Sequence, residues 1–127
     1  ISYAEAKFIE AEVKARQNAA DAADVLNEAI MASCSTVTNG AYDGADIAVY
    51  TPATTDLSRV MFEKWIALFG TPEGYNDYRK TGFPVLTVNP AGHLAVIPKR
   101  CPTPQAERTG NPNAPTPELT DPVWFAQ

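Results

Sequence analysis

The chain has 127 residues, of which 45% are hydrophobic and 20% charged, an ordinary balance for one globular domain. Its 15 acidic and 10 basic residues give a net charge of −5, and no cluster of bases is longer than a pair, which argues against nucleic acid as a partner. No apolar run reaches the roughly 18 residues that a transmembrane helix needs, so this segment is not expected to span a membrane.

The first predicted helix runs from about Tyr3 to Arg16, with a capping box formed by Ser2 and Glu5. Its apolar residues fall into two stripes when they are placed on a helical period. One stripe contains Ala4, Phe8, Ala11 and Ala15, and the other contains Ala6, Ile9 and Val13. We therefore expect this helix to be contacted from two sides, as in layered helical repeats.

The beginning of the chain leads to a further expectation. A helix starts at the second residue, and no initiator methionine, signal peptide or lipid-attachment cysteine precedes it. The chain is therefore expected to be part of a longer protein whose targeting signal lies outside it.

A second helix is predicted from about Asp21 to Ser35, so that residues 1–35 form an antiparallel helix hairpin. Its length is close to the roughly 34 residues of one tetratricopeptide-type repeat. One such pair cannot bury both stripes of its first helix, so residues 1–127 alone are not expected to fold as an independent two-state domain.

Residues 36–54 are predicted to form a loop, because this stretch is rich in glycine, aspartate and threonine. Tyr42 and Tyr50 lie in it. Flat aromatic rings can cover the apolar face of a sugar while hydrogen bonds hold its hydroxyls. These two tyrosines are the ligand-binding candidates of the chain, and ordinary packing is the alternative role for them.

A helix pair is predicted over residues 55–82, where Asp56 or Thr55 caps the first helix and Gly70 ends it. Pro72 suits the first turn of the next helix, and Gly82 its end. The first helix of the pair carries an apolar stripe that we assign to the core rather than to a ligand: Leu57, Met61, Phe62, Trp65, Leu68 and Phe69.

Residues 83–127 are predicted to form an extended, proline-rich coat that lies over the helices. Nine of the 11 prolines lie between Pro84 and Pro122, and they exclude long helices. Residues 85–88 and 94–97 flank a turn and could pair as a short hairpin. Val123–Phe125 offer an apolar plug that could pin the end of the chain to the body.

No arrangement typical of an enzyme or a cofactor site is apparent. The only histidine, His93, follows a turn and has no local orienting partner, and Cys34 and Cys101 lack the spacing of a zinc site. The cysteines are expected to be free thiols or, in an oxidising compartment, a disulfide. Paired acids such as Glu10 and Glu12 are typical of a solvent-exposed helix face rather than of a catalytic pair.

Taken together, these patterns predict no catalytic residue, no metal and no cofactor.

Several ordered segments together resemble the SusD/RagB family. Tyr3–Glu12 resembles its alanine- and glutamate-rich helix, Lys64–Gly70 and Tyr75–Pro84 resemble its conserved helix pair, and Val123–Phe125 resembles its closing aromatic motif. Three short segments before that closing motif resemble the C-terminal part of the family's sequences: Ile97–Arg100, Pro104–Glu107 and Asn111–Asn113. Tyr75, Cys101 and Thr103 depart from the family's usual residues.

The resemblance implies a mainly α fold of tetratricopeptide-like helix pairs with an irregular C-terminal part. It also implies a lipid-anchored outer-membrane protein on the cell surface, which binds glycan or peptide nutrients above a SusC-like TonB-dependent transporter. The anchor would lie N-terminal to this chain. Arg79 is expected to have a structural role, bonding the last carbonyls of its helix. The alternative function is a helical-repeat scaffold for other proteins.

Overall fold

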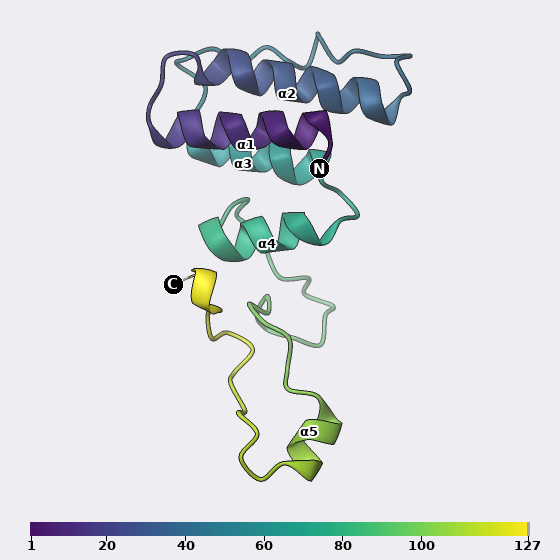
Figure 1. Cartoon of the computed structure of the whole chain (residues 1–127), viewed down its shortest axis with the longest axis vertical. Helices are drawn as coiled ribbons and strands as arrows, with labels where there is room; N and C mark the ends of the chain where they lie inside the picture. The colour runs from purple at the N-terminus through teal and green to yellow at the C-terminus, as the bar shows by residue number, and fades with distance from the viewer. Residues whose placement is uncertain (127) are drawn as a thin grey trace.

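The computed structural model describes residues 1–126, and the fold is mainly helical, with no strand among these residues. In chain order the elements are α1 (Tyr3–Arg16), α2 (Ala22–Val37), α3 (Leu57–Ala67), α4 (Pro72–Thr81), α5 (Gln105–Gly110) and the 3-10 turn η1 (Trp124–Ala126). Helices α1 to α4 stack in layers, and the remaining chain extends away from them (Figure 1). The predicted hairpin and helix pair are both present.

Helix α1 begins as predicted from its local sequence. The Glu5 backbone N–H donates to Ser2 Oγ at 3.1 Å, and the Ser2 backbone N–H donates to Glu5 Oε2 at 3.3 Å. This reciprocal pair satisfies donors that the first turn of a helix leaves free. Lys14 and Arg16 in the last turn complement the helix dipole.

The core lies where α1, α2 and α3 meet. It consists of Phe8, Ala11, Val25, Leu26, Ala29, Ile30 and Val60. Alanines at the α1–α2 contact let the two backbones approach closely, while Phe8, 1% exposed, fills the space between them. Helix α1 contacts both α2 and α3, so it is contacted from two sides as predicted. Its second stripe is only partly covered, because Ile9 and Val13 are 43% and 47% exposed.

Helix α3 is capped as predicted, since the Arg59 N–H donates to Asp56 Oδ1 at 2.8 Å. Its buried face differs from the predicted stripe. Val60, Met61 and Lys64 are buried, whereas Phe62 is 39% exposed and Phe69 is 85% exposed. Phe69 lies beyond the end of α3, in the turn toward α4, so a helical period no longer describes its direction.

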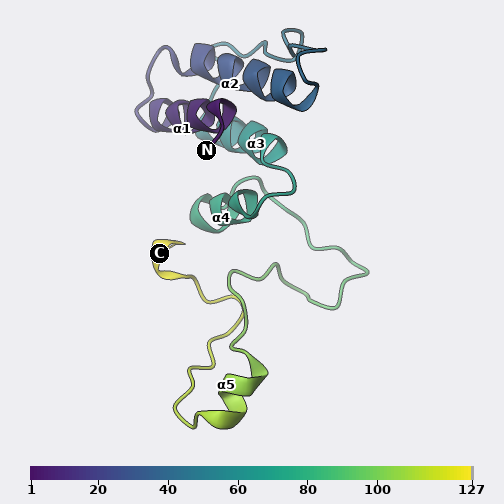
Figure 2. The same ribbon diagram turned by 45° about the vertical axis from the view of Figure 1, so that its right-hand side comes forward.

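The C-terminal part departs most from the predictions. Residues 85–88 and 94–97 do not pair, although the Gly92 N–H closes the expected turn onto Asn89 O at 2.8 Å. The segments themselves contain no proline, but Pro84 and Pro98 border them and cannot extend a ladder beyond four residues. Figures 1 and 2 show that most of residues 83–126 extends away from α1–α3. Leu86 and Ile97 line a small pocket with Trp65 and Leu68 near the end of α3, so this segment covers only a small part of the helical layers rather than forming the predicted coat over them. Gln127, the end of the predicted coat, lies outside the described residues.

Two side chains of α4 hold the returning chain. Tyr75 Oη donates to Pro98 O at 2.6 Å, and Arg79 Nη1 donates to Lys99 O at 3.2 Å. The Arg79 guanidinium also lies 4.5 Å from the ring centre of Tyr75 and 5.0 Å from that of Phe125. The structural role predicted for Arg79 is present, but its partners are this distant segment and Asn76 rather than the last carbonyls of α4. Of the predicted plug, Phe125 makes this contact and Trp124 is 84% exposed.

Candidate ligand-binding groove

The predicted loop, which follows α2, is fastened to that helix at both ends. The Tyr42 backbone N–H donates to Thr38 Oγ1 at 3.0 Å, and the Thr38 hydroxyl lies 2.8 Å from Cys34 O. Further along, the Asn27 side-chain amide donates to Tyr50 O at 2.8 Å and accepts from the Tyr50 N–H at 2.9 Å. The loop therefore has a defined path although it has no regular secondary structure.

A glycine sets how closely the loop approaches α2. Gly44 is buried and has φ +73°, a left-handed conformation that favours glycine. A Cβ atom at this position would lie 2.6 Å from Cys34 Sγ. Because only glycine allows this contact, Gly44 places the loop directly against the half-buried Cys34. Both Cys34 and Cys101 are free thiols.

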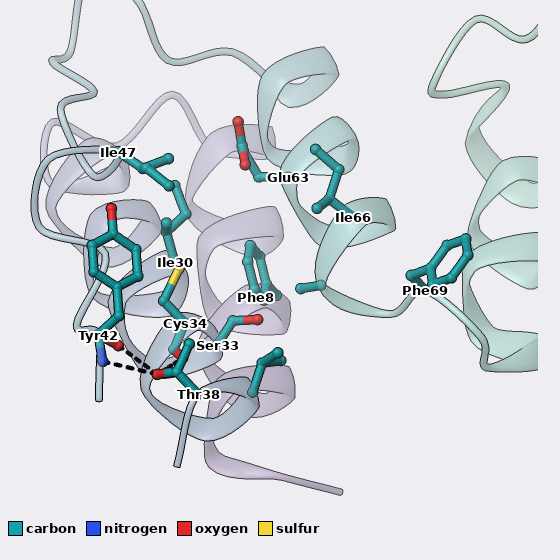
Figure 3. Close-up of a pocket in the computed structure, with 12 residues that line it drawn as sticks. Phe8, Ile30, Ser33, Cys34, Thr38, Tyr42, Ile47, Glu63, Ile66 and Phe69 are labelled. Atoms are coloured by element: carbon teal, nitrogen blue, oxygen red, sulfur yellow. Dashed lines mark hydrogen bonds between the residues drawn. The ribbon is translucent and has the colours of Figure 1, made fainter. Parts of the chain in front are cut away.

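Between this loop and α3 the structure has an apolar groove of about 700 Å³ (Figure 3). Phe8 of α1 and Ile30 of α2 form its floor, Tyr42 and Ile47 line the loop side, and Glu63 and Ile66 line the α3 side. The remaining lining residues are Ser33, Cys34, Val37, Thr38, Ala67 and Phe69. This volume is within the roughly 300 to 1,000 Å³ that is usual for ligand pockets.

Hydrogen bonds at the groove orient its polar side chains. Tyr42 Oη donates to Asp46 Oδ1, and this bond raises the pKa of Tyr42 to about 12 because it stabilises the protonated hydroxyl. Tyr50 Oη donates to Glu63 Oε1 at 2.6 Å. Burial of the Tyr50 hydroxyl, and then this bond, raise the pKa of Tyr50. Both tyrosines are therefore neutral donors at pH 7.

The structure separates the two tyrosines that the sequence analysis paired. Tyr42 lines the groove and is 39% exposed, whereas Tyr50 is half-buried against the core and supports Glu63 from behind. They do not form one flat platform. Glu63 and Phe69 are groove residues that sequence reasoning missed, because Phe69 was assigned to the core and no sequence signal singled out Glu63.

The residues considered for catalysis or metal binding do not form a site. His93 is exposed, in the turn rather than in a hairpin. Among the described residues, no group of three or more histidine, cysteine, aspartate or glutamate side chains could hold a metal ion. No helix in the described part of the chain is long and apolar enough to cross a membrane.

Apart from the groove, a buried ion cluster joins three helices. Lys64 of α3 donates to Glu12 Oε2 of α1 at 3.0 Å and lies 2.9 Å from Asp77 Oδ2 of α4. Arg16 adds a bond of 2.8 Å to the other oxygen of Glu12. Glu12 and Lys64 are each 6% exposed. Segments that lie far apart in the sequence, Tyr3–Glu12, Lys64–Gly70 and Tyr75–Pro84, therefore meet at one cluster of charges.

The pKa values in this cluster reflect a competition between burial and charge. Burial alone would raise the pKa of Glu12, but hydrogen bonds from Arg16 and Lys64 lower it below its usual value. Burial alone would lower the pKa of Lys64, but bonds to Asp77 and Glu12 raise it. Glu12 and Lys64 are thus both charged at pH 7, and removing either one would leave buried charge without compensation.

A helical scaffold with a fastened irregular loop over an apolar groove is the architecture of a binding module. The chain belongs to the SusD-like family: a family model described as "Starch-binding associating with outer membrane" matches residues 1–104. Searches of curated proteins and of solved structures gave no significant match. The family is one of binding proteins, and its description associates this chain with starch or glycan binding and with the outer membrane.

Proposed function

We propose that this protein captures nutrient glycans or peptides at the cell surface and delivers them to a SusC-like TonB-dependent transporter in the outer membrane. The observation that carries the proposal is the family match over residues 1–104, which names both ligand binding and the outer membrane. In this proposal a lipid anchor outside residues 1–127 holds the protein at the membrane. The protein binds its ligand without catalysing a reaction.

The groove beside Tyr42 supports a ligand role for this part of the chain. Its floor is rigid, since Phe8 and Ile30 are 1% and 4% exposed, and its loop wall is held by side-chain hydrogen bonds to α2. A preformed site of this kind loses little conformational entropy on binding. Tyr42 contacts the ligand directly, and Tyr50 contributes by orienting Glu63.

A matched pair of variants tests the ligand-binding role of the tyrosines. Tyr42→Ala removes a partly exposed ring and should weaken ligand binding about tenfold while leaving the melting temperature nearly unchanged. Tyr50→Phe keeps the packed ring, removes the bond to Glu63 and should weaken binding less. Calorimetric titration of natively produced protein with oligosaccharides and short peptides measures both. Unchanged affinity in both variants would place the ligand outside this groove.

Co-purification tests the transporter partner. The natively produced protein should co-purify with a TonB-dependent transporter after mild detergent extraction of outer membranes. Incorporation of a labelled fatty acid into the natively produced protein would support the lipid anchor.

The scaffold function is the second candidate, and the exposed stripe of Ile9 and Val13 favours it. A partly exposed apolar stripe on a repeat-like helix is a surface on which another helix could pack. Binding of a protein partner that is abolished by Ile9→Ser, with no saccharide or peptide binding, would favour the scaffold over nutrient capture.

A further inference from the structure

The groove offers a ligand very few free polar groups. Thr38 uses its hydroxyl on the backbone of the α2 end and the loop, and Tyr42 directs its hydroxyl to Asp46. Tyr50 occupies Oε1 of Glu63. Among residues 1–126, the Ser33 hydroxyl, the Cys34 thiol and Glu63 Oε2 are the side-chain groups of the groove lining without a hydrogen-bond partner. A ligand in the groove therefore meets apolar surface, one hydroxyl, one thiol and one carboxylate oxygen.

The loop wall of the groove carries acidic side chains. Asp43 and Asp46 lie in this loop, and neither has an ion-pair partner within residues 1–126. Asp21 and Glu28, near the start and middle of α2, are already paired with Lys14 and Lys7 and add little to the charge at the groove. On the opposite wall Glu63 is the only charged lining residue, and it has no ion-pair partner within the described part of the chain. A cationic group on the ligand would compensate this charge.

We propose that the groove binds a short peptide whose apolar side chains fill it and whose single lysine or arginine pairs with Glu63. This inference rests on the proposed function and names the class of nutrient. The apolar side chains would cover Phe8, Ile66 and Phe69, and the basic side chain would reach the free oxygen of Glu63. Phe69, 85% exposed at the rim, becomes covered in the complex.

A bare oligosaccharide fits this groove poorly. Each pyranose carries several hydroxyls, and a hydroxyl that leaves water without a new partner is destabilised. Ser33, Cys34 and one oxygen of Glu63 cannot replace the water around a series of sugar units, whose hydroxyls surround each ring. A peptide differs because it can direct its apolar side chains into the groove while its backbone amides stay in solvent. The aromatic side chains also lie at three separate places in the groove: Phe8 is in the floor, and Tyr42 and Phe69 are at opposite sides (Figure 3). They do not present adjoining flat rings for successive sugars.

The decisive experiment compares ligands that differ in one charge. Calorimetry on the natively produced protein would use a blocked tetrapeptide of leucine, lysine, phenylalanine and leucine, the same peptide with norleucine or glutamate in place of lysine, and maltoheptaose. The lysine peptide should bind about tenfold more tightly than the norleucine peptide, because an ion pair with a partly buried carboxylate adds to apolar contact. The glutamate peptide should bind more weakly still.

Variants at the groove identify the partner of that charge. Glu63→Gln can still accept from Tyr50, and it should remove the preference for lysine over norleucine while leaving norleucine binding unchanged. Glu73→Gln, an exposed carboxylate of α4 outside the groove, is the matched control and should preserve the preference. Phe69→Ser should weaken all three peptides, whereas Val85→Ser, at another exposed apolar side chain, should weaken none.

Three outcomes would overturn the inference. A preference for lysine that persists in Glu63→Gln would assign the cation to another carboxylate. Peptide binding unaffected by Phe69→Ser would place the peptide elsewhere. Binding of maltoheptaose without binding of any peptide would reject the peptide class while the proposed nutrient-binding function stands. If a broad panel of peptides and glycans all failed to bind, the proposed function would fail together with the inference.

Discussion

The helical layers and the C-terminal segment of this protein are held by different kinds of contact. In the described part of the chain, the buried hydrophobic core from Ala4 to Leu68 belongs to the helical layers, and the ion cluster of Glu12, Lys64 and Asp77 joins three of those helices. Residues 83–126 contribute the buried Pro84 and two half-buried side chains near Trp65, and they are otherwise attached by two hydrogen bonds and by the Arg79 guanidinium between two rings. Extensive apolar burial and compensated charge thus hold the first region, whereas a few polar contacts and little apolar burial hold the second.

The largest expected effect concerns the exposed stripe of the helical region. Ile9 and Val13 on α1, with Ile66 and Phe69 near the end of α3, leave apolar surface in water. At about 25 cal/mol per Å², 200 Å² of such surface forfeits roughly 5 kcal/mol, comparable with the stability of a small domain. A chain of residues 1–127 expressed alone should therefore lack a sharp melting transition. Differential scanning calorimetry tests this, and a single cooperative peak from the monomer would refute it.

Breaking the ion cluster should give the next largest loss in the free energy of unfolding. Lys64→Ala leaves Glu12 and Asp77 buried without their shared cation, which should cost about 3 to 5 kcal/mol in the natively produced protein. Lys80→Ala is the control, because Lys80 is exposed and lies 3.9 Å from Glu12 Oε1, and it should cost at most about 0.5 kcal/mol. Chemical denaturation measures both. Equal effects of the two variants would contradict a central role for Lys64.

The same cluster predicts a pH dependence of stability. The pKa of Glu12 is lower in the folded protein than its ordinary value of 4.5, so its contribution to stability is present above pH 4.5 and is lost as the pH falls through the folded pKa. The pKa of Lys64 is raised above 10.5, so its contribution is present below pH 10.5 and is lost as the pH rises through the folded pKa. Urea denaturation between pH 3 and pH 8 should show an acid decrease that Glu12→Gln reduces. An unchanged acid decrease in Glu12→Gln would assign it to other carboxylates.

The smallest effect is expected where the C-terminal segment meets α4. Arg79→Lys keeps the positive charge but loses the planar group that contacts Tyr75 and Phe125 and bonds Lys99 O, so it should weaken the attachment by about 1 kcal/mol. Limited proteolysis should cut residues 83–126 faster in this variant, with helical circular dichroism unchanged. Arg108→Lys, on α5, provides the control. Loss of helix content in Arg79→Lys would mean that this segment stabilises the helical layers.

Short-range signals explain which elements could be predicted from the sequence. The capping box of Ser2 and Glu5, the cap at Asp56 and the glycine after α4 act within a few residues, and each marks a helix end that the structure confirms. The hairpin predicted at residues 85–97 is absent although its turn forms, because a turn signal acts within a few residues, whereas a ladder needs two longer segments side by side. Pro84 and Pro98 border the two segments and limit any ladder to four residues.

The sequence by itself determined the mainly α class, the first four helices with bounds within two residues, and the family, because caps, apolar periodicity and ordered motifs are properties of neighbouring residues. Only the tertiary structure decided which faces are buried. It buried Lys64 between two carboxylates from other helices, left Phe69 at the rim of a groove, and turned Tyr50 toward Glu63 while Tyr42 lines the groove. These outcomes depend on partners far apart in the chain, and helical periodicity contains no information about them.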